Sequence, residues 1–136
     1  YAIHPAITQT KDGTILSFLR GPNPMPVQLT KDLGDTWEQK ETPFPGISSG
    51  QKASALRLQS GAILLVSMDT PKKVTPSGGA FAALSLDEGR TWEYTKALPG
   101  VSGYMAAAQA QDGTIIVFGT RQSTVRFNEK WLKTKE

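Results

Sequence analysis

The chain has no cysteine and only one histidine, His4. The absence of cysteine excludes a disulfide framework and a thiolate metal site. One histidine cannot supply a metal site by itself, so we expect neither a metal ion nor another cofactor. The sequence also has no apolar run that approaches the ~20 residues of a membrane-spanning helix, and we therefore expect no membrane span.

Net charge is also small. The formal net charge is +3, and no block of lysine or arginine stands out except the tail from Lys130 to Lys135. A short basic end of this kind is typical of a solvated terminus, whereas nucleic-acid binding needs a broader basic surface. We therefore expect no nucleic-acid partner.

Turn-forming residues, by contrast, are plentiful. The 136 residues include 13 glycines and 9 prolines, which are spread along the chain. This distribution favours many short strands. The length is that of one domain, and the 38% hydrophobic and 20% charged contents are ordinary for a globular protein.

One octapeptide pattern occurs twice, as Thr-Lys-Asp-Leu-Gly-Asp-Thr-Trp at 30–37 and as Ser-Leu-Asp-Glu-Gly-Arg-Thr-Trp at 85–92. In such a turn the aspartate can accept hydrogen bonds from backbone N–H groups and the glycine can adopt a positive φ. The tryptophan ring can pack beside the next strand. We predict a structural role for the shared positions, including both aspartates. These positions are Thr30, Asp32, Gly34, Thr36, Trp37, Ser85, Asp87, Gly89, Thr91 and Trp92.

Short β-rich runs surround these two octets and form three similar units. Asp12-Gly13 predicts a hairpin of type I′ between the first two runs. The expected strands cover 2–10, 14–20, 27–30 and 37–40 in the first unit and 53–58, 62–68, 80–84 and 92–95 in the second, which has a loop at 70–79. The third unit has expected strands at 105–110, 114–120 and 124–128, with 131–133 as a candidate fourth strand.

The spacing of turn residues supports a repeat. The hairpin glycines Gly13, Gly61 and Gly113 are 48 and 52 residues apart, and the octet aspartates Asp32 and Asp87 are 55 apart. A period of about 40 to 50 residues with four strands per repeat is typical of β-propeller blades. The alternative is a generic antiparallel sandwich whose turns happen to be alike.

The octets resemble the Asp-box of the sialidase-like BNR-repeat family. The runs 4–20, 49–65 and 103–117 are similar to blade openings and to the closing blade of that family. The resemblance implies an all-β fold, the C-terminal three blades of a six-bladed propeller of sialidase type. The blades are expected at about 1–46, 47–100 and 101–136, and the last can be incomplete because it lacks an octet.

An open arc of three blades leaves two sheet faces uncovered. Two arrangements would cover them: a homo-oligomer that closes the ring, or further blades in a longer chain. The resemblance also favours a secreted or periplasmic location.

For the hydrolases of this family, the resemblance implies a central pocket with an arginine triad, a tyrosine nucleophile paired with glutamate, and an aspartate acid/base. Arginine binds both oxygens of a sugar carboxylate, and tyrosine is the sialidase exception to the two-carboxylate rule. Tyr104 matches the closing-blade tyrosine, so it is the candidate catalytic residue. Arg20 and Arg121 end the second strand of their units and are candidate substrate ligands, as is His4 at the first blade opening.

Each of these residues also has a purely structural interpretation. Tyr104 can be a packed aromatic residue, Arg20 and Arg121 can be charges at strand ends, and His4 can pack beside the channel. No glutamate is a convincing partner for Tyr104, and an acid/base aspartate would lie outside this sequence. Three functions therefore stay open: a sialidase-like glycan-active domain complete only in a full ring, a non-catalytic module that binds carbohydrate or protein, and a structural half-propeller that oligomerises.

Overall fold

The computed structural model describes residues 2–69 and 72–134. Outside this description lie residue 1, residues 70–71 of the expected loop at 70–79, and residues 135–136, which include the last lysine of the basic tail. The described chain is almost entirely β-structure in three antiparallel sheets. None of its helices is long and apolar enough to cross a bilayer.

The three sheets follow one another along the chain, and within each sheet neighbouring strands are consecutive in sequence. The first sheet contains β1 (Ile3–Gln9), β2 (Ile15–Arg20), β3 (Pro26–Thr30) and β4 (Glu38–Glu41). The second contains β5 (Ser54–Arg57), β6 (Ile63–Asp69), β7 (Gly79–Ser85) and β8 (Tyr94–Ala97). The third contains only β9 (Ala106–Gln109), β10 (Ile115–Phe118) and β11 (Thr124–Phe127).

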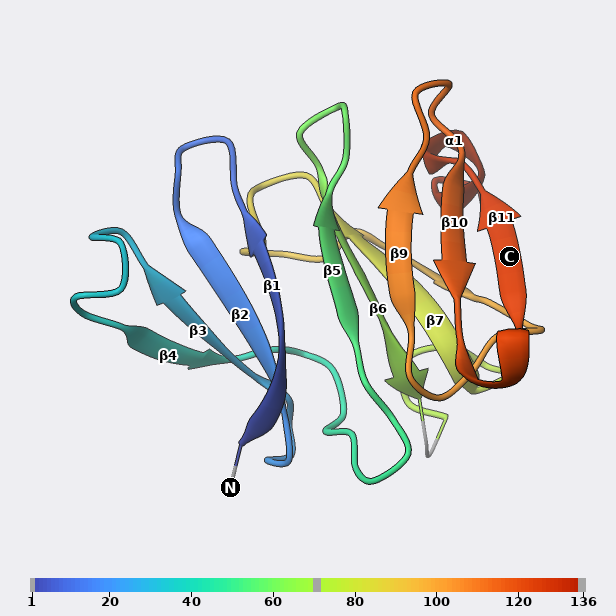
Figure 1. Ribbon diagram of the computed structural model, residues 1–136, viewed down its shortest axis with the longest axis horizontal. Coiled ribbons are helices and arrows are strands. Elements are labelled where there is room, and N and C mark those ends of the chain that lie inside the picture. The colour runs from blue at the N-terminus through green and yellow to red at the C-terminus, as the bar shows by residue number, and fades with distance from the viewer. Residues whose placement is uncertain (1, 70–71, 135–136) are drawn as a thin grey trace.

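The sheets fan out with their first strands adjacent (Figure 1). β1, β5 and β9 run in the same direction at the inner side of the fan, and a parallel bridge joins Lys52 to Tyr104 just before β5 and β9. Consecutive up-and-down sheets placed around a common inner side form a partial β-propeller. The predicted fold class is therefore confirmed.

The inner hairpins differ from the expected turn type. In the first, the Thr10 amide donates to the Thr14 carbonyl at 2.8 Å, and only Gly13 has a positive φ, at 91°. A type I′ turn requires positive φ at both central residues. The loop is therefore a three-residue turn that ends in a left-handed glycine, and Gly61 and Gly113 occupy the same place in the other two sheets.

The two octets form the same set of hydrogen bonds. In each, the first hydroxyl donates to the aspartate at 2.8 Å, and the amide of the fourth residue after that aspartate also donates to it, at 2.9 Å in the first octet and 2.8 Å in the second. Each glycine amide donates back to the first hydroxyl. Gly34 and Gly89 have φ values of 93° and 88°. The two aspartates thus accept the hydrogen bonds that hold these turns.

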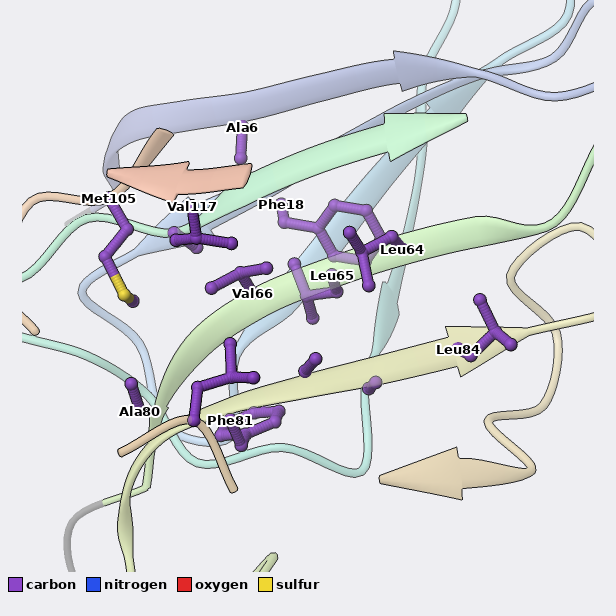
Figure 2. Close-up of a cluster of buried hydrophobic side chains, with 14 of the residues drawn as sticks. Ala6, Phe18, Leu64, Leu65, Val66, Ala80, Phe81, Leu84, Met105 and Val117 are labelled. Carbon is purple, nitrogen blue, oxygen red and sulfur yellow. The ribbon is translucent and has the colours of Figure 1, made fainter. Parts of the chain in front are cut away.

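The core lies mainly around the second sheet. Every residue of β6 is buried, and β7 is buried from its second residue onward. The first and third sheets cover both faces of the second sheet. Its two central strands, β6 and β7, therefore consist mostly of consecutive apolar residues. Figure 2 shows Leu64, Val66 and Phe81 from this sheet in one cluster with Phe18 of the first sheet and Val117 of the third.

The third sheet lacks a fourth strand, so the expectation for 131–133 is wrong. A short helix, α1 (Glu129–Leu132), follows β11 and packs against β7 and β8. The Asn128 side chain caps it by accepting from the Trp131 amide at 2.8 Å, which satisfies a helix N–H that would otherwise be unpaired. The Lys96 ammonium lies 4.4 Å from the Trp131 ring centroid and 3.1 Å from its carbonyl. Local capping and this contact favour a helical turn at the end of the described chain.

Candidate functional site

The candidate site lies at the end of the fan where β2 ends and β9 begins. The Arg20 Nη1 atom donates to the Tyr104 hydroxyl at 3.0 Å, and the guanidinium carbon lies 5.9 Å from the Tyr104 ring centroid. The same nitrogen donates to the carbonyls of Gln51 at 3.1 Å and Ser48 at 3.4 Å. Arg20 thereby joins the first sheet to the turn before β5 and to the residues before β9.

Equivalent residues at or just before the inner strands β1, β5 and β9 meet around Tyr104. The residues nine positions before Gly13, Gly61 and Gly113 are His4, Lys52 and Tyr104. The His4 and Tyr104 rings meet edge to face with centroids 5.6 Å apart. The Lys52 amide donates to the Gly103 carbonyl at 3.0 Å, and the Lys52 carbonyl accepts from Met105 at 3.1 Å. The repeat therefore places one residue from each sheet at the same site.

The backbone of Tyr104 is fixed by the turn that follows β10. Its amide donates to the Thr120 hydroxyl at 2.9 Å, and the Thr120 amide donates to the Ser102 carbonyl at 2.9 Å. The two segments approach so closely that a Cβ on Gly103, whose φ is 85°, would collide with the Thr120 side chain. The phenol is nevertheless 43% exposed, so Tyr104 is accessible on a rigid support.

Arg121 lies at the same end but does not end a strand. β10 ends at Phe118, and Arg121 is in a 3₁₀ turn over 120–122 with a φ of 61°. The expectation that it closes the second strand of its unit is therefore wrong, because the chain turns at Gly119 to bring Thr120 against Ser102. The Arg121 side chain is exposed.

Of the five non-glycine residues with positive φ in the described chain, three lie at this end of the fan and two lie in the octet turns. His4, Arg121 and Gln122 have φ values of 51°, 61° and 60° without being glycine, and the pairing of β1 shifts between Ile3 and Ala6. Left-handed conformations at such residues are costly and are retained where the surrounding structure imposes them, often at functional sites. These outliers point to this end of the molecule.

A buried carboxylate fixes the loop after β6, which ends on the same side as β2. The two Asp69 oxygens accept from the amides of Lys73, Val74 and Thr75 at 2.6, 2.7 and 2.7 Å. Asp69 is fully buried, and three backbone donors offset the loss of water around its charge. The role of Asp69 is therefore to order a loop.

The glutamates lie elsewhere, at the hairpin end of the strands or along the outer strands. Glu129 accepts from the Ser60 hydroxyl at 2.7 Å beside the Gly61 hairpin. Glu41 and Glu88 line a groove of about 330 Å³ between the first sheet and the second octet, together with Leu16 and Trp92. The groove meets β1 and β2 at their hairpin end, opposite Arg20, and from there follows the outer strand β4, on which Glu41 lies. Within the described residues no cluster of three or more His, Asp or Glu could hold a metal ion.

The turn aspartates have low pKa values because they accept many hydrogen bonds. Bonds from the Thr36 side chain and amide and from Thr30 lower the pKa of Asp32 from 3.8 to about 2. For Asp87, partial burial raises the pKa, but bonds from Thr91 and Ser85 outweigh it, so the pKa is lowered. A carboxylate held ionised in its own turn is suited to architecture and is a poor proton donor near neutral pH.

The structure thus brings together three of the predicted site residues, Tyr104, Arg20 and His4, and places Arg121 in the adjoining turn. It adds Lys52, which sequence reasoning missed. The signal was present, because Lys52 precedes Gly61 by the same nine residues that separate His4 from Gly13. Gln51 and Ser48 contribute only backbone carbonyls, and residue type does not reveal such acceptors.

Comparison with known proteins gives a likeness in fold to a solved structure. No family model matches the sequence, and no curated protein matches it either. Among solved structures, the chain is similar to the GH93 alpha-L-arabinofuranosidase of Fusarium graminearum, a β-propeller enzyme determined in complex with arabinobiose. The TM-score is 0.50, the identity is 17%, and the match covers 85% of this chain and 39% of the enzyme. This likeness supports the propeller fold, and the chain spans only about two fifths of that enzyme's length.

Proposed function

We propose that this chain forms part of a glycan pocket in a sialidase-like propeller, with Arg20 as the ligand for a sugar carboxylate and Tyr104 beside it. The single observation that carries the proposal is the 3.0 Å hydrogen bond from Arg20 to the exposed Tyr104 hydroxyl. It joins a carboxylate-binding group to a potential nucleophile on the inner side of the fan.

The guanidinium is held in place before any ligand arrives. In the described chain the Arg20 side chain donates its hydrogen bonds only from Nη1. The N–H groups on Nε and Nη2 are therefore left for the two oxygens of a carboxylate. A preordered side chain loses less conformational entropy on binding. Arg121, exposed in the adjoining turn, adds a second positive charge at this end, which suits an acidic sugar.

In this proposal the chain binds its ligand but does not hydrolyse it alone. A tyrosine nucleophile needs a base to take its proton, and the leaving group needs an acid. The described glutamates are placed away from Tyr104, with Glu129 at the Gly61 hairpin and Glu41 and Glu88 in the distal groove. Hydrolysis would therefore require carboxylates from further blades or another chain.

Calorimetric titration with sialyllactose and with lactose tests the proposal. We expect sialyllactose to bind and lactose not to bind, and the affinity for sialyllactose to fall as salt is added. Arg20→Ala should weaken this affinity at least tenfold, which corresponds to about 1.4 kcal/mol. Arg90→Ala is the matched control, because Arg90 is exposed in the second octet and lines the distal groove. Binding that is unchanged in Arg20→Ala would contradict this assignment.

A neutral arabinose oligosaccharide is the second candidate ligand, because the structurally similar enzyme was solved with arabinobiose. Titration with arabinobiose separates the two: neutral-sugar binding without salt dependence would favour this candidate. Failure of both sugars would favour a protein ligand or a purely structural half-propeller, the remaining alternatives for this fold.

A further inference from the structure

The repeat makes residues in the three sheets directly comparable. Counting from the hairpin glycines, Phe18 in the first sheet is equivalent to Val66 in the second and Phe118 in the third. The strand pairing agrees, because Phe18 pairs with Ala6 and Phe118 pairs with Ala106. Leu16, Leu64 and Ile116 are equivalent in the same way.

These equivalent residues have very different surroundings. Leu16 and Phe18 are only 5% and 2% exposed, and Leu64 and Val66 are fully buried, because the next sheet covers each pair. In the third sheet, Ile116 and Phe118 are 41% and 50% exposed. The outer face of the third sheet therefore presents an apolar pair that is buried in both preceding sheets.

The tryptophan of the second octet helps to cover this pair in the first sheet. Trp92 of the second octet meets the Phe18 ring edge to face at 5.9 Å and the Phe44 ring at 5.3 Å. Gly89 of the same octet lies against Leu16, since a Cβ there would be 2.9 Å from the leucine Cδ1. The second octet thus packs on the first sheet.

None of the described sheets precedes the first octet. Its tryptophan, Trp37, is 45% exposed, and its ring lies over its own turn, where the indole nitrogen donates to the Gly34 carbonyl at 3.1 Å. Ile7, on the inner strand of the same sheet, is 60% exposed, whereas the equivalent Ala55 and Ala107 are half-buried. The first sheet therefore presents an uncovered tryptophan and isoleucine.

We propose that a second copy of this chain covers these faces, with the Trp37 ring of one copy packed on Ile116 and Phe118 of the other. Trp37 is the equivalent of Trp92, and Ile116 and Phe118 are the equivalents of Leu16 and Phe18. Both sides of the contact between Trp92 and the first sheet thus have an exposed counterpart, one in the first sheet and one in the third. A head-to-tail contact between copies either closes them into a ring or continues into an open filament. Propellers typically have four to eight blades, and two copies of the three described sheets together supply six. The assembly is therefore a closed dimer with two identical contacts.

Sedimentation or light scattering of the full chain tests the stoichiometry. We expect a mass twice the 14.7 kDa of one chain, and a single-chain mass for Trp37→Ala and for Phe118→Ala. Leu33→Ala is the matched control, because Leu33 is an 87% exposed apolar residue in the same octet as Trp37, and it should remain dimeric. Circular dichroism checks that the variants stay folded, which is expected because both side chains are at the surface.

The orientation of the contact is tested by crosslinking, since the natural chain has no cysteine. A mixture of Trp37→Cys and Phe118→Cys should form a disulfide-linked pair under oxidation, while neither variant alone should do so. A single-chain mass for the natural protein, an open series of larger species, or linkage of either variant with itself would each overturn the proposal. If the natural protein had a single-chain mass, a second copy would not cover these faces. That result would leave the proposal of glycan binding at Arg20 untouched.

Discussion

Arg20 and Tyr104 are separated by 84 positions in the sequence, yet the guanidinium of one donates to the hydroxyl of the other at 3.0 Å. The bond spans the fan from the end of β2 to the start of β9. Because the same Arg20 nitrogen also holds the turn before β5, one side chain connects all three sheets on their inner side. The candidate site is therefore also a structural junction.

Removal of this junction should be measurable in stability. Arg20→Ala is expected to lower the free energy of unfolding by about 1 to 2 kcal/mol, since a charged donor to three partly exposed acceptors is lost. Arg90→Ala should change it by less than about 0.5 kcal/mol. Urea unfolding followed by tryptophan fluorescence gives both values, and equal effects in the two variants would show that the junction contributes nothing.

Asp69→Asn should destabilise the protein by about 3 kcal/mol. An asparagine has one acceptor oxygen, and its NH₂ group would face backbone donors that the carboxylate now satisfies. The affected amides are those of Lys73, Val74 and Thr75, and hydrogen exchange at these positions should become faster than in the natural chain. Glu93→Gln, an exposed change, is the control; unchanged protection of the three amides would refute the assignment.

Trp92→Ala should cost about 3 kcal/mol, near the lower end for removal of a large aromatic residue, because the ring is half-buried against the first sheet. Leu86→Ala in the same octet should be nearly neutral, since Leu86 is 45% exposed. A double-mutant cycle of Trp92 with Phe44, whose rings are 5.3 Å apart, should give a coupling of about 0.5 to 1.5 kcal/mol. Additive single effects would mean that the two rings do not interact.

Stability should fall in acid because of Asp32. Its folded-state pKa of about 2 lies below the ordinary value of 3.8, so the folded form binds the proton less readily than the unfolded form. The contribution of Asp32 is therefore fully present above about pH 4 and is lost as the pH falls towards 2. Unfolding midpoints measured between these pH values should decline less steeply in Asp32→Asn. Asp35→Asn is the control, because only the Asp35 amide, and not its side chain, takes part in the hydrogen bonds described for the octet.

Much of the fold follows from local sequence patterns. The octets at 30–37 and 85–92 and the hairpin glycines predict turns that need only a few consecutive residues, and the structure contains them. The exact hairpin type was wrong because Asp12-Gly13 is compatible with two loop lengths, and only the pairing of Thr10 with Thr14 distinguishes them.

The end of the described chain could not be predicted in this way. An aromatic and aliphatic run at 131–133 suits a strand as well as a short helix. The choice depends on Asn128 as a cap and on Lys96, which comes from a different sheet and lies over the Trp131 ring. Tertiary contacts of this kind override weak local preferences.

The sequence by itself determined the repeat, the turn chemistry of the octets and the equivalent positions of His4 and Tyr104 in their units. These features depend only on spacing along one chain. Only the tertiary structure decided that Arg20 donates to Tyr104, that Lys52 lies beside them, and that Trp92 is covered while Trp37 is not. The physical reason is distance: hydrogen bonds and ring contacts act over a few ångströms, and strands far apart in sequence come within that range only when the sheets pack against one another.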